Sequence, residues 1–181
     1  RMAALMETQI IFVWSHDAFR VGEDGPTHEP VEQEAQIRLM EKLHNHSGQP
    51  SMLVLRPADT EETTVAWRLA MENTHRPTGL ILSRQDINSL PVVNPEGVKH
   101  GAYIVEKDED PQVVMIASGS EVSTLIAGAQ LLRAEGIRLH IVSIPSEGLF
   151  RQQTKEYQEQ VLPQGIKRFA LTAGLNCTME G

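Results

Sequence analysis

The stretch VGEDGPTHEP, residues Val21–Pro30, contains two glycines, two prolines, three acids and one histidine. It lies between an apolar run, IIFVW (10–14), and a helical pattern, VEQEAQIRLMEKL (31–43). The apolar run predicts a buried strand, and Pro30 suits the first turn of a helix, where its missing N–H costs nothing. Because ligands of open parallel sheets bind beyond the carboxyl ends of the strands, the loop between this strand and this helix is a candidate binding segment.

Apolar runs alternate with helical patterns along the rest of the chain, which is typical of an α/β fold with mostly parallel sheets. We expect two α/β units: residues 1–90, a linker with proline and glycine at 91–100, and residues 101–181, the second unit being truncated. Further strands are expected at MLVLR (52–56), TGLILS (78–83), AYIVE (102–106), QVVMIAS (112–118), IRLHIVS (137–143) and IKRFAL (166–171).

Helix starts are marked by residues that accept hydrogen bonds from free backbone N–H groups. Asp59 is expected to cap the helix that runs through TVAWRLAMEN, with Glu62 closing a capping box. Ser120 is expected to cap a helix whose apolar residues recur at spacings of three and four, and Gly136 to end it. Ser146 is expected to begin another helix.

The composition argues against nucleic acid and membranes as partners and favours a reducing compartment. The 181 residues are 40% hydrophobic and carry a net charge of −8 without a basic cluster, which argues against nucleic acid as a partner. One cysteine, Cys177, excludes a disulfide framework within the chain and favours a reducing compartment, the cytoplasm. The apolar runs are too short to span a bilayer, so no membrane contact is expected. The first and last residues read like cuts within a longer polypeptide.

Three predicted strands of the first unit end in a cationic or ionisable side chain: His16, Arg56 and Arg84. Two or three such groups at one sheet edge could bind a phosphate, because guanidinium presents parallel donors. Arg56 precedes Pro57, and we expect it to satisfy nearby carbonyls or acids instead. For His16 and Arg84 the spacing alone leaves both the phosphate-binding and the structural interpretation open.

Asp24 and His28 would be held over the same edge by the loop that Gly22, Gly25 and Pro26 shape. An imidazole there can bind hydroxyls and move protons near neutral pH, and an aspartate can accept from a sugar hydroxyl. The alternative is that the aspartate caps a turn and the histidine packs at the helix start.

Weaker candidates have ordinary explanations. His44 and His46 have a spacing that a metal could use, but a solvated loop is the expected setting, and no metal site is predicted. The segment SGSE (118–121) could hold an anion at a helix start, although a helix cap is expected. Cys177 has no evident activating partner.

The run SHDAFRVGEDGPTHEPVEQ closely resembles the transketolase signature, and the similarity continues through LRPADTEETTVAW, PTGLILSRQ, IASGSEV and AEGIRLHIVSIPS. The chain resembles the last part of the pyrimidine-binding domain and most of the C-terminal domain of that family. SHDAFRV departs from the usual continuation, and EKLHNHSGQ lengthens one connection. Related thiamine enzymes, dihydroxyacetone synthase and deoxyxylulose-phosphate synthase, and a non-catalytic interaction module are the alternatives.

The resemblance implies an enzyme that moves a two-carbon ketol unit between sugar phosphates with thiamine diphosphate and a divalent cation (Mg or Ca). By matched position, His16 and Arg84 resemble ligands of the substrate phosphate, and Asp24 the residue that recognises a sugar hydroxyl. His28 resembles the catalytic and cofactor-binding histidine beside the thiazolium, which assists proton movement.

The same resemblance implies that the full-length protein is a homodimer. It also implies that other segments of the protein bind most of the cofactor. The glutamate that activates the aminopyrimidine and the diphosphate- and metal-binding domain belong to segments outside this chain. We therefore expect this chain alone to bind thiamine diphosphate poorly and not to turn over.

Overall fold

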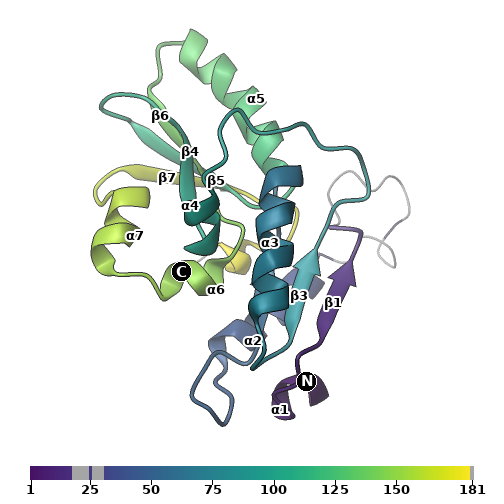
Figure 1. Cartoon of the computed structure of the whole chain (residues 1–181). Coiled ribbons are helices and arrows are strands. Elements are labelled where there is room, and N and C mark those ends of the chain that lie inside the picture. The colour runs from purple at the N-terminus through teal and green to yellow at the C-terminus, as the bar shows by residue number, and fades with distance from the viewer. Residues whose placement is uncertain (18–24, 26–30, 180–181) are drawn as a thin grey trace.

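The computed structural model describes residues 1–17, 25 and 31–179, which form two sheets with helices on their faces (Figure 1). The expected α/β class with mostly parallel sheets is confirmed. Asp24 and His28 lie outside the described residues, as does Pro30 at the predicted helix start. The elements in chain order are α1 (Met2–Leu5), β1 (Ile11–Trp14), α2 (Gln33–Lys42), β2 (Leu53–Leu55), α3 (Thr60–Glu72), β3 (Thr78–Ile81), α4 (Pro95–Lys99), β4 (Tyr103–Lys107), β5 (Val113–Ala117), α5 (Glu121–Ala134), β6 (Leu139–Ser143), α6 (Glu147–Arg151), α7 (Lys155–Val161), β7 (Lys167–Leu171) and a 3-10 turn at Asn176–Thr178.

The first sheet has the strand order β1-β3-β2, and all three strands are parallel. Helix α3 packs its alanines Ala66 and Ala70 on one face of this sheet. On the other face, Ile37 and Met40 of α2 pack against Val54 of β2. Coverage of both faces explains why every residue of β2 and β3 is buried rather than every second one.

The second sheet has the order β4-β6-β5-β7, with β4 antiparallel to β6 and the other pairs parallel. Helix α5 buries Val122, Leu125 and Ala129 on one face, which confirms the apolar spacing predicted for this helix. Helices α6 and α7 cover the opposite face with Phe150 and Val161. Figure 1 shows α5 beside this sheet and α6 and α7 at the opposite side.

The first strand is less buried than its sequence predicts. Phe12 is 38% exposed and Val13 is 47% exposed, although both belong to an apolar run that predicts a buried strand. β1 and β2 are both edge strands, but β2 is fully buried, whereas the described residues leave much of the surface of β1 uncovered.

One short helix lies where the sequence pattern indicates only irregular structure. Asn94 accepts a hydrogen bond from the N–H of Gly97, and Pro95 occupies the first turn of α4. Val98 is fully buried, and α4 packs beside α3 (Figure 1). Helix α7 was likewise not predicted; it begins at Thr154, whose hydroxyl accepts from Tyr157 N–H.

Two predicted helix caps are confirmed and two details are wrong. Asp59 accepts from the N–H of Glu62, and Ser146 accepts from the N–H of Leu149. Glu62 does not close a capping box, because its carboxylate accepts from the N–H of Ala58 instead. Ser120 makes no side-chain cap bond, because its hydroxyl is bonded to a distant carboxylate. Gly136 has φ +81 and ends α5 as predicted.

Candidate functional site

The ends of β1 and β3 lie side by side at one edge of the first sheet. Trp14 pairs with Ile81, and the N–H of Leu82 donates to the Trp14 carbonyl at 2.7 Å. His16 comes two residues after β1 and Arg84 three residues after β3, so parallel pairing brings both chain segments to the same edge. This is the arrangement that the phosphate-binding prediction requires.

The His16 ring is exposed, and its Nδ1 lies 3.0 Å from the hydroxyl of Ser15. In the predicted loop, Gly25 is the described residue, and its φ of +72 is the left-handed conformation that favours glycine in a tight turn. A cavity of about 60 Å³ at the base of this segment is too small for a sugar phosphate. Its lining comes from the end of β1, the start of α2 and Gly174, and consists of Trp14, His16, Asp17, Val31, Gln33, Glu34, Ile37, Ile81 and Gly174.

Arg56, the third strand-end cation, is fully buried in an ionic cluster. Its guanidinium lies 2.6 Å from Glu121, 3.3 Å from Asp17 and 3.7 Å from Glu34, and it donates to the Ser118 carbonyl at 3.0 Å. The expectation that Arg56 satisfies carbonyls and acids is confirmed. Glu121 and Ser118 belong to the second sheet's connections, so this side chain joins the two sheets.

The backbone of Arg56 also bonds to the second sheet's connections. Its N–H donates to the Pro145 carbonyl at 2.8 Å, and its carbonyl accepts from the N–H of Gly119 at 3.1 Å. A Cβ on Gly119 would lie 2.8 Å from the Arg56 side chain, and its φ is +62, so close approach and backbone conformation both require glycine there. The end of β2 is therefore fixed between the β5–α5 and β6–α6 loops.

The buried charges continue along α2 to α6. Arg38 lies 2.8 Å from Glu34, 3.3 Å from Glu147 and 3.7 Å from Glu41. Burial raises the pKa of Glu41 to about 7, against the attraction of Arg38, and burial likewise raises the pKa of Glu147. Burial also pushes the pKa of Glu34 upward, but Arg38 and Arg56 outweigh it and hold that pKa below its usual value.

Sequence reasoning missed this ionic cluster as a connected unit. A signal was present: Glu34, Arg38 and Glu41 recur at spacings of four and three, which places them on one helix face. The partners at the starts of α5 and α6, Glu121 and Glu147, could not be assigned from spacing, because they are distant in sequence.

The weaker candidates fall into ordinary settings. His44 and His46 are exposed in a loop, as expected, and no group of three His, Cys, Asp or Glu side chains within residues 1–17, 25 and 31–179 could hold a metal. The helix start at SGSE does face an anion, but the anion is the chain's own Asp17 carboxylate, which accepts from the Ser120 hydroxyl at 2.5 Å. Cys177 is an exposed free thiol.

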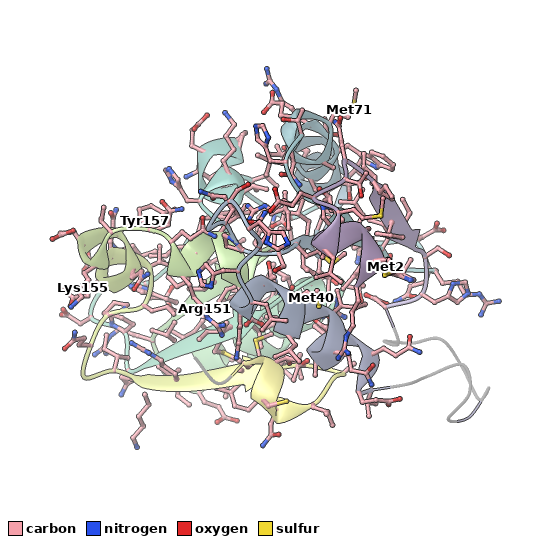
Figure 2. The ribbon with its side chains drawn as sticks, turned by 90° about the horizontal axis from the view of Figure 1, so that it is seen from below. Met2, Met40, Met71, Arg151, Lys155 and Tyr157 are labelled. Atoms are coloured by element: carbon pink, nitrogen blue, oxygen red, sulfur yellow. The ribbon has the colours of Figure 1, made fainter. Side chains whose placement is uncertain are left out.

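Two larger cavities are lined by neither His16 nor Arg84. One of about 540 Å³ is lined by residues of α6, α7, β5 and β7, among them Arg151 and Lys155, which Figure 2 labels over those helices. The other, of about 530 Å³, lies between α1, β1 and α2 and includes Met40. In the part of the chain that the structure describes, no helix combines the length and apolar character needed to cross a bilayer.

Comparison with known proteins decides the family. Residues 1–89 match the transketolase pyrimidine-binding domain, and residues 101–181 match the transketolase-like C-terminal domain. The chain is 44% identical to transketolase of Geobacillus stearothermophilus, over 99% of this chain and 26% of that protein. It belongs to the transketolase family.

Solved transketolase structures share the fold. A transketolase from Leishmania mexicana superposes with a TM-score of 0.87 at 39% identity, over 99% of this chain and 25% of that one. A Pichia stipitis transketolase mutant in complex with fructose 6-phosphate gives a TM-score of 0.84 at 32% identity, over 97% of this chain and 25% of that one. The chain therefore spans about a quarter of the length of the transketolases it matches.

Proposed function

We propose that the protein to which this chain belongs transfers a two-carbon ketol unit from a ketose phosphate to an aldose phosphate, using thiamine diphosphate. Family membership supports this proposal, and a relative of this chain has been solved in complex with fructose 6-phosphate. The observation that carries it to this chain's residues is the parallel pairing of β1 with β3, which gathers the segments of His16 and Arg84 at one sheet edge. The same strand ends hold ligands in open parallel sheets generally.

The proposed roles follow from the chemistry of each side chain. His16 and Arg84 bind the substrate phosphate, with the guanidinium offering paired donors to its oxygens. Asp24 accepts from a sugar hydroxyl and selects its configuration. His28 binds the donor's hydroxyl and carries a proton, since its imidazole changes charge near neutral pH.

Thiamine diphosphate, when bound, supplies the carbon nucleophile that breaks and forms the carbon–carbon bond. The described residues include no group of three His, Cys, Asp or Glu side chains that could hold the cation (Mg or Ca) that accompanies the diphosphate. We therefore assign binding of the cofactor mainly to other segments of the protein. We also propose that the protein is a homodimer in the cytoplasm. Neither nucleic acid nor a membrane is proposed as a partner.

The test is substitution of Arg84 in the complete enzyme. Arg84→Ala is expected to raise KM for phosphorylated ketoses about tenfold or more, because one charge-assisted contact is lost, and to change KM for unphosphorylated ketoses little. Arg68→Ala is the matched control, because Arg68 is an exposed arginine on α3 that pairs with Glu72. Equal effects of Arg84→Ala on both substrate classes would show that Arg84 is structural.

His28 is tested in the same enzyme by a different measurement. His28→Ala is expected to lower kcat by about a hundredfold, since a positioned acid–base group is lost. Binding of thiamine diphosphate, followed by fluorescence titration, is expected to persist. Retained turnover in this variant would remove His28 from the mechanism.

A further inference from the structure

We propose that Asp17 is a positioning residue for His16, held in place by Arg56 at the end of β2 and by Ser120, which precedes α5 beside the second sheet. The proposal rests on the function proposed above, in which His16 binds the substrate phosphate. It assigns a part in substrate binding to the C-terminal domain, whose own residues showed no chemical role in the sequence.

The two neighbouring residues face opposite environments. The side chain of His16 is exposed, whereas Asp17 is only 6% exposed. One Asp17 carboxylate oxygen accepts from the Ser120 hydroxyl at 2.5 Å and lies 3.3 Å from the Arg56 guanidinium. The same guanidinium also donates to the Asp17 backbone carbonyl at 3.3 Å. Both the side chain and the backbone after His16 are therefore fixed.

The residues that hold Asp17 are themselves immobilised. Arg56 is fully buried and makes its shortest ion pair, 2.6 Å, with Glu121 at the start of α5. Ser120 is 5% exposed and precedes that same helix. A hydroxyl at a helix start ordinarily caps its own helix, but Ser120 makes no cap bond and donates to Asp17 instead. The Ser120 hydroxyl thus makes a long-range bond to Asp17 in place of the local helix cap.

His16 is consequently held on both sides along the chain. Before it, β1 is paired with β3 through the hydrogen bond between Leu82 N–H and the Trp14 carbonyl. After it, Asp17 is held by Ser120 and Arg56. A ligand side chain on a fixed backbone loses less conformational freedom when the phosphate binds, so the anchored segment strengthens binding without touching the substrate.

The experiment compares two serines of one helix in the complete enzyme. Ser120→Ala removes the bond to Asp17, whereas Ser123→Ala, the control, removes a hydroxyl that donates to the Ser120 carbonyl of its own helix start. Ser120→Ala is expected to raise KM for phosphorylated ketoses about three- to tenfold, because a less firmly held His16 segment must be ordered when the phosphate binds, with less than a twofold change for unphosphorylated ketoses. Ser123→Ala is expected to leave both KM values within twofold.

A double-mutant cycle with His16→Ala separates positioning from general stability. If Asp17 acts through His16, then Asp17→Asn and Ser120→Ala raise KM in the wild-type background and add nothing in the His16→Ala background. Additive effects, or equal effects of Ser120→Ala on both substrate classes, would overturn the inference while leaving the proposed function standing. A normal KM for phosphorylated ketoses in His16→Ala itself would instead overturn the assigned role of His16, and the inference with it.

Discussion

Glu62 shows how a single buried carboxylate can join two parts of this chain. One of its oxygens accepts from the hydroxyls of Tyr103 at 2.8 Å and Ser143 at 2.7 Å, and the other accepts from the N–H of Ala58 at 2.7 Å. Burial raises the pKa of Glu62, and the three donors oppose that rise. Tyr103 and Ser143 belong to the second sheet, so the carboxylate at the start of α3 is satisfied largely by the other sheet.

Tyr103→Phe is expected to destabilise the fold by about 2 kcal/mol, because it removes a hydrogen bond to a buried carboxylate. Tyr157→Phe is the matched control: its hydroxyl donates to the neutral backbone carbonyl of Ala102 at 2.8 Å, so a loss of about 1 kcal/mol is expected. Chemical denaturation of both variants measures the difference. Equal losses would show that the charge on Glu62 contributes nothing to the bond with Tyr103.

Single residues were predictable from sequence where their partners are local, and not where the partners are distant. Arg56 was correctly expected to be structural, and Asp59 and Ser146 cap the helices that follow them. Ser120 was expected to cap its helix, but its hydroxyl bonds to a carboxylate 103 positions earlier in the chain, and no local pattern indicates that contact. His16 lies where the pattern places it, and its role as a phosphate ligand stays a prediction.

Among the secondary-structure elements, the start of α3 both caps its own helix and holds a distant segment of the chain. One carboxylate oxygen of Asp59 accepts from the N–H of Glu62 at 2.8 Å, and the other accepts from the N–H of Leu90 at 2.9 Å. The first bond caps the helix, and the second fixes the chain before α4. The chain around Leu90, which connects the two sheets, is thereby bonded to the start of α3.

Asp59→Ala is expected to cost about 2–3 kcal/mol, because it removes a helix cap and leaves the buried N–H of Leu90 without its acceptor. Thr154→Ala provides the comparison, since Thr154 caps α7 through a 3.3 Å bond at an exposed position, and about 0.5–1 kcal/mol is expected. Thermal unfolding of both variants tests the ranking. A cost for Asp59→Ala no larger than that for Thr154→Ala would mean that the Leu90 bond is dispensable.

Elements were predictable where burial on both faces produced a continuous apolar run, as for β2 and β5. Helix α4 was missed because only five residues are helical, too few for an apolar period to show. Its Asn94–Pro95 start was nevertheless readable as a cap followed by a first-turn proline. The exposure of β1 could not be predicted, since the sequence of a strand does not say which edge of the sheet it occupies.

For the whole molecule, the contact between the sheets is ionic as well as apolar. Helix α6 approaches α2 so closely that a Cβ on Gly148 would lie 2.3 Å from a carboxylate oxygen of Glu41. That carboxylate accepts from the N–H of Val54 at 3.1 Å and faces Arg38 on its own helix, with Glu147 and Arg151 on α6. Burial of these acids makes the junction sensitive to their protonation.

The contribution of the Glu41 carboxyl to stability is therefore expected to fall as pH rises from about 4.5 to about 7. Unfolded, Glu41 loses its proton near its ordinary pKa of 4.5, but burial in the folded chain raises that pKa to about 7. The folded state holds the extra proton between these values, so the stabilisation is complete below 4.5 and lost above 7, a change of at most about 3 kcal/mol. Burial raises the pKa of Glu147 and Glu121 too, which adds to the same slope.

The measurement is Tm as a function of pH for wild type, Glu41→Gln and a control, Glu72→Gln, at an exposed position on α3. Glutamine keeps the shape of the protonated carboxyl and cannot ionise, so Glu41→Gln is expected to flatten the slope between pH 4.5 and 7 and to raise Tm at pH 8. Glu72→Gln is expected to follow wild type. An unchanged slope in Glu41→Gln would mean that its carboxylate stays ionised in the folded chain, with Arg38 and Arg151 outweighing burial at the junction.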